Sequence, residues 1–423
     1  MRAVISGEPP MDGPAGSFGA DFDPLREIYL ADPYPFLAEA REAAPVFYCD
    51  AIDHWIVTRY HDIRNIFRTP ALFSAANANS PLRPPCPMAA KALREGGFRG
   101  VPTLASIDPP AHTRLRKLAN IAFTPKRVAE MEGFVRDLAT RFCTERLREG
   151  RADIVRDLAW ELPALVLFRI LGVPDNEVPR VKTGSWNRIL FIYGRPAEAV
   201  QVQAAEGMAA FWRYAEGLVE SRQQDPRDDF ISDLVHAQDG DGPSLTPPQA
   251  AAIVLGLLFA GHETTTGLLG NAFRRLLTDR PAWQAICEDP SLIPNAVEEV
   301  LRLDSSVIAW RRRTTQAVVI GGVSVPERAD LLLMLGAANR DPTVFHDPDR
   351  FDIWRANAHE HLSFGSGPHF CLGAPLARLE ARVVLEEVSA RVPGQRLVDG
   401  VPLQFAPNVS FRGPLSLPVE WNV

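Results

Sequence analysis

The segment that most constrains the fold is a single helical pattern that runs from Thr246 to Thr278. Thr246 is suited to the N-cap, Pro247 to the first helical position and Gln249 to the capping-box position, so the start of the helix is well marked. The pattern stops shortly before Pro281. A helix of about 30 residues is roughly 45–50 Å long, which is enough to cross a whole domain.

The composition of this predicted helix changes at its midpoint. The first half is apolar on all sides, which predicts that it is buried. His262, Glu263 and Thr264 then follow in direct succession. A carboxylate and a hydroxyl inside a buried helix cost free energy unless they are paired or used. The midpoint is therefore the first candidate for a functional site.

The chain predicts one large domain and a cytoplasmic location. It has 423 residues without a long linker or repeat, so we expect a mobile tail over residues 1–20 and one domain over residues 21–423. The N-terminus lacks the apolar core of a secretory signal. The longest apolar stretch, Ala250–Gly261, is shorter than the about 20 residues that span a bilayer. The net charge of −7 argues against nucleic-acid binding, and five cysteines do not make a disulfide scaffold.

Hydrophobic periodicity predicts a mainly α protein with a smaller β region. The predicted helices besides 246–278 cover residues 128–148, 204–222, 295–303 and 375–391. The predicted strands are few and short, at residues 55–58, 318–320, 331–335 and 410–420.

The most informative cysteine is Cys371, which lies in the glycine-rich loop Phe364–Gly373. A lone cysteine is more often a small buried hydrophobe. Here Gly365 permits a tight turn, and the predicted helix that contains Pro375 begins just after the cysteine, so backbone amides can stabilise a thiolate. Gly373 lets a flat cofactor approach the backbone. Such a loop can hold one thiolate as the axial ligand of a haem iron.

This loop resembles the F-x-x-G-x-x-x-C-x-G haem-binding loop of the cytochrome P450 monooxygenases. The resemblance implies a triangular helical prism around a buried haem b, with Cys371 as the axial ligand and Phe364, Gly365 and Gly373 beside the cofactor. It also implies that one atom of the co-substrate O₂ is inserted into an organic molecule, by hydroxylation, dealkylation or epoxidation.

The midpoint of the long helix strengthens the resemblance. Ala260-Gly261-His262-Glu263-Thr264 is similar to the oxygen-activating motif of that family. The resemblance implies that Ala260 and Gly261 leave room for O₂ beside the haem, that Thr264 donates a hydrogen bond to it, and that Glu263 supplies protons through water. The alternative is that the Thr264 hydroxyl merely bonds the carbonyl four residues earlier.

A further motif resembles a structural part of the same family. Glu299 and Arg302 stand three residues apart on a predicted helix, which by itself predicts only a surface ion pair. The resemblance makes them a buried pair braced by Arg350, and this choice rests on resemblance because Glu298 could also reach Arg302.

Four residues resemble the ligands of the haem propionates. They are His112, Arg116, Arg312 and His369. His112 and Arg116 stand four residues apart and share one helix face, and buried propionates need cationic or donor partners. The alternative is a solvated basic face, and the register within the run 311–313 is open.

The substrate region is predicted to be apolar. The resemblance places Ala260, Ile308, Ala309 and Val409 near the substrate, which would be a small apolar or aromatic molecule held mainly by burial. The alternative is that these residues are plain core.

The electrons must come from a partner. No G-x-G-x-x-G motif and no C-x-x-C pair is present, so we expect neither a flavin nor an iron–sulfur site in this chain. A ferredoxin or a flavin/iron–sulfur reductase is the expected donor. The segments 31–36 and 73–77 also resemble haem domains of self-sufficient members, in which a phthalate-dioxygenase-reductase-like module is fused downstream.

A basic patch is predicted as the docking surface for this donor. It would combine Arg114 and Lys117 with Arg378 and Arg382, which are four apart on the next helix. The alternative is that these side chains only solvate two helices.

Two rival functions remain at the level of sequence. A peroxide-driven peroxygenase would share the fold, but such enzymes typically replace the acid–Thr pair, which Glu263 and Thr264 provide here. A haem-binding sensor or carrier would leave that pair unexplained and would need an output domain. Consumption of O₂ coupled to turnover separates these functions from a monooxygenase.

Overall fold

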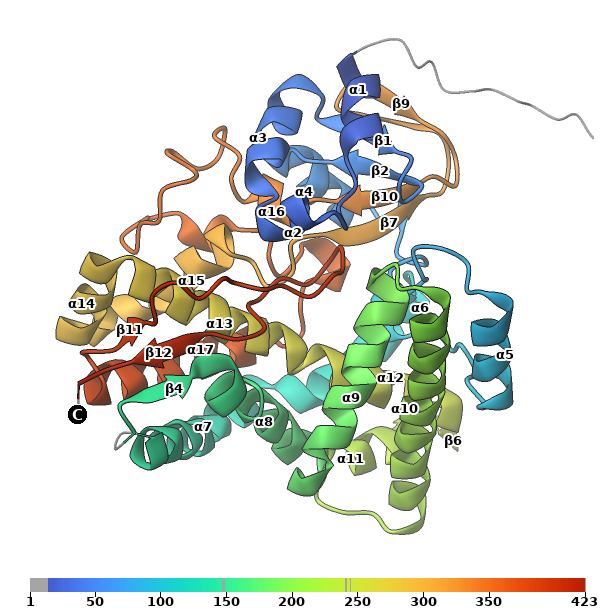
Figure 1. Cartoon of the computed structure of the whole chain (residues 1–423). Helices are drawn as coiled ribbons and strands as arrows, with labels where there is room; N and C mark the ends of the chain where they lie inside the picture. Colours follow the sequence, from blue (N-terminus) through green and yellow to red (C-terminus); the bar gives the residue numbers. More distant parts are fainter. Residues whose placement is uncertain (1–13, 147–148, 240–241, 244, 423) are drawn as a thin grey trace, which may run out of the picture.

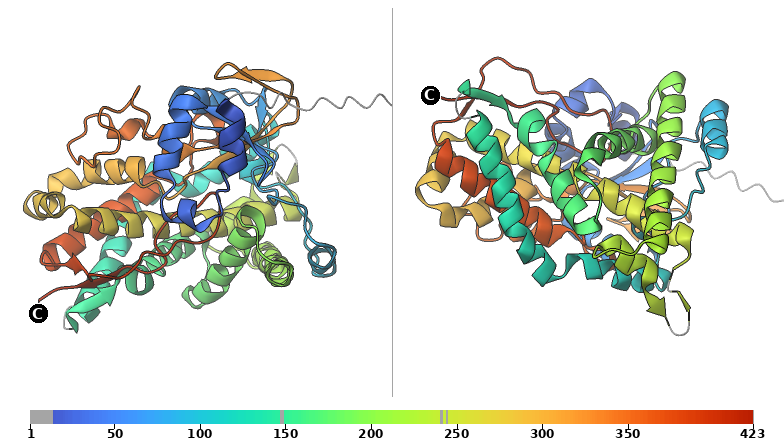
Figure 2. Two further views of the ribbon diagram at one scale, coloured as in Figure 1. Left: turned by 45° about the horizontal axis from the view of Figure 1, so that its top comes forward. Right: turned by 90° about the horizontal axis from the view of Figure 1, so that it is seen from below.

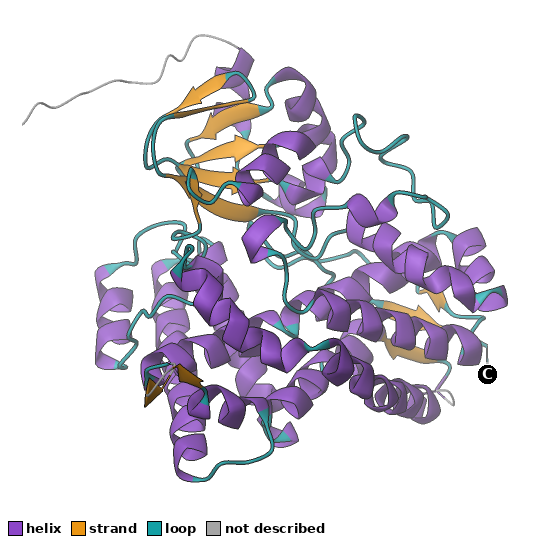
Figure 3. Cartoon of the chain, turned by 180° about the vertical axis from the view of Figure 1, so that it is seen from behind, coloured by secondary structure: helices purple, strands orange, loops and turns teal. Residues whose placement is uncertain are grey.

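The structure is a computed structural model, and it describes residues 14–146, 149–239, 242–243 and 245–422. Helices make up most of it, and the strands are gathered mainly at one end (Figures 1 and 3). The α-helices are α1 Pro14–Asp21, α2 Glu27–Ala31, α3 Tyr34–Ala43, α4 Tyr60–Arg68, α5 Pro87–Glu95, α6 Ala111–Ala119, α7 Pro125–Arg146, α8 Leu162–Leu171, α9 Val178–Arg188, α10 Glu198–Gln224, α11 Phe230–His236, α12 Pro247–Ala260, α13 Glu263–Thr278, α14 Arg280–Glu288, α15 Ile293–Leu303, α16 Leu335–Ala338 and α17 Ala374–Arg391.

The strands are short. They are β1 Val46–Cys49, β2 His54–Val57, β3 Phe73–Ser74, β4 Arg151–Asp153, β5 Gln238–Asp239, β6 Gly242–Pro243, β7 Trp310–Thr314, β8 Val318–Ile320, β9 Val323–Val325, β10 Asp330–Leu333, β11 Arg396–Leu397 and β12 Pro418–Glu420. Single helical turns and π-type turns connect several of these elements, among them η6 Ile189–Tyr193 and η9 Gly367–His369.

The largest sheet joins distant parts of the chain. Its strand order is β1-β2-β10-β7-β3. β2 and β10 run parallel, with Trp55 opposite Leu331, whereas the other neighbours are antiparallel. A smaller sheet of order β11-β12-β4 lies near the C-terminus (Figure 1). The two views of Figure 2 show the helices grouped beside these sheets, with α7 along α17.

The predicted fold class is confirmed, and most predicted helices differ from the observed ones only at their ends. The predicted strand over residues 410–420 is wrong except for β12, because the segment before it makes only isolated bridges at Phe411 and Pro414. Part of the predicted tail is also wrong, since α1 is helical from Pro14. Residues 1–13 lie outside the described residues.

The long central helix is interrupted where the sequence predicted continuity. α12 ends at Ala260, and α13 begins at Glu263. His262, at the junction, has φ −123° and ψ −41°. Gly261 is in close contact with its surroundings, since a Cβ there would lie 2.7 Å from the Leu167 Cδ1 atom. The interruption therefore places Gly261 against α8 and separates the apolar half from the polar half.

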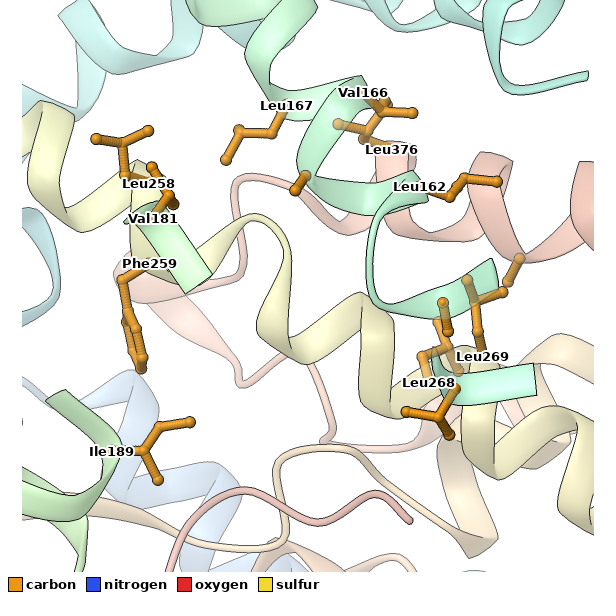
Figure 4. Packing of buried hydrophobic residues seen from close by; sticks show 14 of the residues in the cluster. Leu162, Val166, Leu167, Val181, Ile189, Leu258, Phe259, Leu268, Leu269 and Leu376 are labelled. Atoms are coloured by element: carbon orange, nitrogen blue, oxygen red, sulfur yellow. The ribbon is translucent and has the colours of Figure 1, made fainter. Parts of the chain in front are cut away.

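The segment 247–278 forms the core of the helical region. It is long and apolar enough to cross a membrane by length and composition, but 61% of its most apolar window is buried inside the protein, as in a core helix. Figure 4 shows Leu258 and Phe259 near the end of α12 and Leu268 and Leu269 farther along on α13. This helix pair positions one wall of the site described next.

Candidate active site

An internal cavity with a volume of about 270 Å³ lies against the junction of α12 and α13. Ala260, Gly261 and Thr264 line it from this junction, and Cys371 and Gly373 line it from the loop before α17. The cavity thus brings together two of the motifs that the sequence singled out, although more than 100 residues separate them.

The cysteine loop is held in a tight conformation. The Cys371 amide donates to the Phe364 carbonyl at 2.9 Å, and Gly365 and Gly367 both have φ +71°. A Cβ at Gly367 would lie 2.6 Å from the Phe67 carbonyl oxygen, so only glycine fits there. Burial raises the pKa of the Cys371 thiol, whereas the amides at the start of α17 and the Arg116 guanidinium favour the thiolate.

The surroundings of Cys371 fit a flat, anionic cofactor such as haem. A Cβ at Gly373 would meet no atom within 4 Å, so the backbone there faces open space inside the cavity. Both ring nitrogens of His112 and the Nε2 atom of His369 are buried without a hydrogen-bond partner. Unpartnered buried donors are costly, so they call for an acceptor that the protein itself does not provide.

The four predicted propionate ligands lie together. The rings of His112 and His369 have centroids 3.9 Å apart. The pKa of His369 is lowered to about 3 by burial and by Arg312, His112 and Arg116. Arg312 is buried and lies over the Phe67 ring, while an Arg116 Nη donates to the Phe370 carbonyl at 2.7 Å. The cluster is strongly positive, as a site for carboxylates must be.

The register within 311–313 is settled by the β7 geometry. Arg312 lines the cavity. Arg311 instead donates to the Ser80 and Ala78 carbonyls, and Arg313 pairs with Asp330.

The hydroxyl of Thr264 lies on the cavity wall and donates to the Ala260 carbonyl at 2.9 Å. The bond to the carbonyl four residues earlier, which the sequence left as an alternative, is therefore made. A hydroxyl oxygen has acceptor capacity besides this donated bond, so Thr264 can still accept a hydrogen bond from a molecule in the cavity.

The Glu263 carboxylate has two charged or ionisable neighbours, Lys182 and His262, that the sequence did not predict. Its Oε1 atom lies 3.5 Å from Lys182 Nζ and 3.3 Å from His262 Nδ1. Lys182 Nζ also bonds the Thr266 hydroxyl at 3.1 Å, and His262 Nε2 lies 3.1 Å from the Ser185 hydroxyl. Burial raises the pKa of Glu263, but Lys182 and His262 outweigh it and lower that pKa to about 2. Glu263 is thus an ionised partner of α9, and it is not among the cavity-lining residues.

The predicted structural triad requires one correction. Glu299 and Arg302 are fully buried and form a bidentate pair, with both N–O distances 2.7 Å. Arg355, not Arg350, is the second arginine on this carboxylate, at 3.1 Å. Arg350 contributes its backbone carbonyl, which accepts bonds from both arginines, whereas its side chain is exposed. Glu298 pairs with Arg378.

The substrate-facing residues also require correction. Ala260 lines the cavity, but Ile308, Ala309 and Val409 do not. Ile308 and Val409 line a separate small pocket on the other side of the segment. The neighbouring residues of the extended segments, Val307 and Phe411, occupy the cavity wall instead and form an isolated bridge. Successive side chains of an extended segment point to opposite sides, so the step of one residue from Ile308 to Val307 reverses the facing, whereas Phe411 borders both pockets.

Three cavity or network residues were not predicted. Arg188 and Glu380 line the cavity, and Lys182 pairs with Glu263. Glu380 is buried with both carboxylate oxygens unpartnered, and burial raises its pKa well above the usual value. The sequence signal that could have identified all three is a charged residue on a helix face that is otherwise apolar. Periodicity could not show which of these faces is buried.

The predicted basic patch is partly neutralised. Arg378 forms a bidentate bond with Glu298, at 2.6 and 2.9 Å, and lies over the Phe364 ring. Arg382 pairs with Glu132 and Glu386 at 2.8 Å each. These two arginines therefore do not add the excess positive charge that the sequence suggested.

Comparisons with known proteins agree with this site. The family described as "Cytochrome P450" matches residues 287–388. The chain is 35% identical to "Cytochrome P450 monooxygenase PikC" of Streptomyces venezuelae, over 95% of this chain and 94% of that protein. Its fold is similar to "cytochrome P450 CREJ in complex with (4-ethylphenyl) dihydrogen phosphate", with a TM-score of 0.91, 39% identity and coverage of 93% of this chain and 98% of that one.

A larger protein also contains a similar structure. "Crystal structure of an intact type IV self-sufficient cytochrome P450 monooxygenase" matches with a TM-score of 0.90 and 37% identity, over 96% of this chain and 53% of that chain. The relatives are monooxygenases and hydroxylases of organic molecules, and the predicted fold and reaction class are confirmed by them. The cavity bordered by Cys371 and Thr264, together with this similarity along nearly the whole chain, shows that the protein belongs to the cytochrome P450 family.

Proposed function

We propose that Cys371 holds the iron of a haem b and that the haem propionates lie among His112, Arg116, Arg312 and His369. The observation that carries the proposal is the cavity itself, which has a cysteine on one wall and, at its edge, two arginines beside two histidines with ring nitrogens that lack a partner in the protein. Haem bound there would supply an iron at which O₂ is activated with two electrons.

The role proposed for Thr264 and Glu263 is to deliver protons. Thr264 contributes a hydroxyl on the cavity wall, and Ala260 and Gly261 leave space beside it. Glu263 is adjacent in sequence but is tied to Lys182 and His262. A proton would therefore pass from solvent through this buried polar group and water to the Thr264 hydroxyl, so the strength of the Lys182 contact would influence the rate of delivery.

The electron donor proposed for the chain is a ferredoxin or a flavin/iron–sulfur reductase in the cytoplasm. The donor is either a separate protein or a fused module, and the similarity to a self-sufficient monooxygenase that is about twice as long supports the fused form. The surface that receives electrons from the donor would lie near the loop that contains Cys371. Because Arg378 and Arg382 are paired with carboxylates, Lys117, which is exposed on α6, is the better candidate for steering a donor.

The test of the cofactor proposal is the spectrum of the reduced, CO-bound protein. The wild type should show the red-shifted Soret band of a thiolate-ligated haem, and Cys371→His should lose it. Cys287→Ser is the matched control, because Cys287 is a half-buried cysteine on α14 that does not line the cavity. A Cys371→His protein with an unchanged band would refute the assignment, and product formation that requires O₂ and a reductant would test the reaction.

A further inference from the structure

The cavity wall contains a buried cation that no residue of the described chain neutralises. Arg188, the last residue of α9, is only 4% exposed and lines the cavity. Its Nε atom has no hydrogen-bond partner. No carboxylate of the described residues forms an ion pair with it. A guanidinium stays protonated in proteins, so this charge is buried without compensation, which is costly unless a ligand supplies the anion.

Arg188 does not belong to the propionate cluster. Arg116, Arg312 and His369 influence one another electrostatically, whereas Arg188 interacts with Tyr193 and Arg311. Its guanidinium carbon lies 5.1 Å from the centroid of the Phe259 ring, next to Ala260 at the end of α12. A haem whose propionates are bound by the first cluster would therefore leave this cation to a second ligand.

Arg311 adds to the positive charge at this end of the cavity. It is fully buried behind the wall, and its guanidinium donates to the Ser80 and Ala78 carbonyls, which are neutral acceptors. The guanidinium carbon of Arg311 lies 5.0 Å from the centroid of the Tyr193 ring. Two cations that both influence Tyr193 attract an anion more strongly than one.

Four aromatic side chains line the cavity beside this charge. Phe411 lies edge-on to Tyr193, Phe259 and Trp310, with centroids 4.9, 5.5 and 6.3 Å away. All four residues line the same cavity. Aromatic walls favour a flat aromatic ligand through stacked and edge-to-face contacts. Apart from the propionate cluster, the cavity thus offers an apolar aromatic environment with a cationic group at Arg188.

We propose that the substrate is an aromatic molecule with an oxyanion group, a carboxylate or a phosphate ester, which the Arg188 guanidinium binds. The inference rests on the proposed function, because it assigns the substrate of the same haem site. Both oxyanions match the planar fork of a guanidinium, which can bind two oxygens side by side. It adds an anionic group to the apolar or aromatic substrate that the sequence predicted.

The test uses optical titration of the ferric holoprotein, in which a ligand near the iron shifts the Soret band. The anionic probes are 4-propylbenzoate and 4-propylphenyl phosphate. Their neutral counterparts are methyl 4-propylbenzoate and 4-propylanisole. The wild type should bind each anion at least about tenfold more tightly than its neutral counterpart, as expected for a charge-assisted contact in a buried site. The relative affinities of the two anions distinguish a carboxylate site from a phosphate site.

The variants isolate the charge of Arg188. Arg188→Gln should weaken anion binding at least about tenfold but change the affinity for the neutral probes less than about twofold. Arg188→Lys should retain a part of the preference, since it keeps the charge but not the fork. Arg180→Gln is the control, because Arg180 lies on the same helix with an exposed side chain and pairs with Glu177. It should leave both affinities unchanged.

The outcomes separate this proposal from the function on which it rests. Three results overturn the proposal even when the reduced CO spectrum is normal. They are a wild type that shows no preference for the anionic probes, an Arg188→Gln protein that keeps that preference, and an Arg188→Gln protein in which the binding of anionic and neutral probes is weakened equally. A wild type without the thiolate-type band would instead contradict the proposed function. If Arg188→Gln fails to retain haem, the wild-type comparison and Arg188→Lys decide the question.

Discussion

Lys182 Nζ lies 3.5 Å from the Glu263 carboxylate, and the Lys182 side chain is only 4% exposed. The contact joins α9 to the first turn of α13, beside the residue that contributes the cavity hydroxyl. A buried charge of this kind is tolerated because it is paired, and breaking one partner leaves the other uncompensated.

Lys182→Met should therefore destabilise the protein by about 3 kcal/mol, because it strands the Glu263 carboxylate in a buried site. Denaturant unfolding of the holoprotein measures this change. The double variant Lys182→Met/Glu263→Gln is the matched control, and it should recover most of the loss since no charge is left unpaired. A single variant as stable as the wild type would show that the pair carries no such energy.

Acid should weaken the same cluster in two steps. The pKa of His262 is lowered by burial and by Lys182, so the unfolded chain takes up a proton more readily and stability begins to fall below about pH 6.5. The pKa of Glu263 is lowered from 4.5 to about 2, so its stabilisation is complete above pH 4.5 and is lost as the pH falls toward 2.

The Glu263 contribution amounts to about 3 kcal/mol at most, from 1.36 kcal/mol per pKa unit. Unfolding free energies measured between pH 7 and 3 should fall less steeply in Glu263→Gln than in the wild type. Equal slopes in the two proteins would contradict the depressed pKa.

Thr264→Ala should keep haem and substrate binding but divert reducing equivalents to peroxide, because the cavity wall loses the hydroxyl that we propose delivers protons. Product formed per NAD(P)H and peroxide released are measured together. Thr264→Ser retains the hydroxyl and should keep most of the coupling. Wild-type coupling in the alanine variant would exclude a role for this hydroxyl in proton delivery.

Arg355→Gln should destabilise the protein by about 3 kcal/mol, since it removes one of the two arginines on a fully buried carboxylate. Arg350→Gln should change stability by less than about 0.5 kcal/mol, because its exposed side chain is not part of the network. Thermal unfolding of both variants, with haem content as a second readout, compares them directly. A larger loss of stability in Arg350→Gln than in Arg355→Gln would show that Arg350, and not Arg355, braces the Glu299–Arg302 pair.

Local patterns predicted the helices and the cysteine loop because their signals lie within a few residues. Capping residues marked the start of α12, and the glycines around Cys371 specify a turn that only they can adopt. Contacts between segments that are distant in the sequence were harder to predict. Arg350 and Arg355 lie in one loop and both present a guanidinium, and only the path of that loop past Glu299 decides which side chain reaches it.

The interruption at His262 and the facing of Ile308 could not be predicted for a related reason. Helical periodicity does not mark residue 261, where the helix breaks and Gly261 packs closely against Leu167 from a distant segment. An extended segment has two faces, and nothing local to Ile308 states which one meets the cavity. The role of Arg188 could not be predicted either, because only the folded structure shows that no described carboxylate forms an ion pair with it.

The parallel pairing of β2 with β10 has a consequence for synthesis on the ribosome. Trp55 emerges early, but its partner Leu331 follows only after most of the helices, and α7 likewise emerges long before its partner α17. Contacts of such large sequence separation form slowly, because a long loop must close before any of them is made. The nascent chain therefore carries an unfinished sheet edge for most of its translation, and Cys371, the proposed haem ligand, becomes available only after its loop has left the exit tunnel.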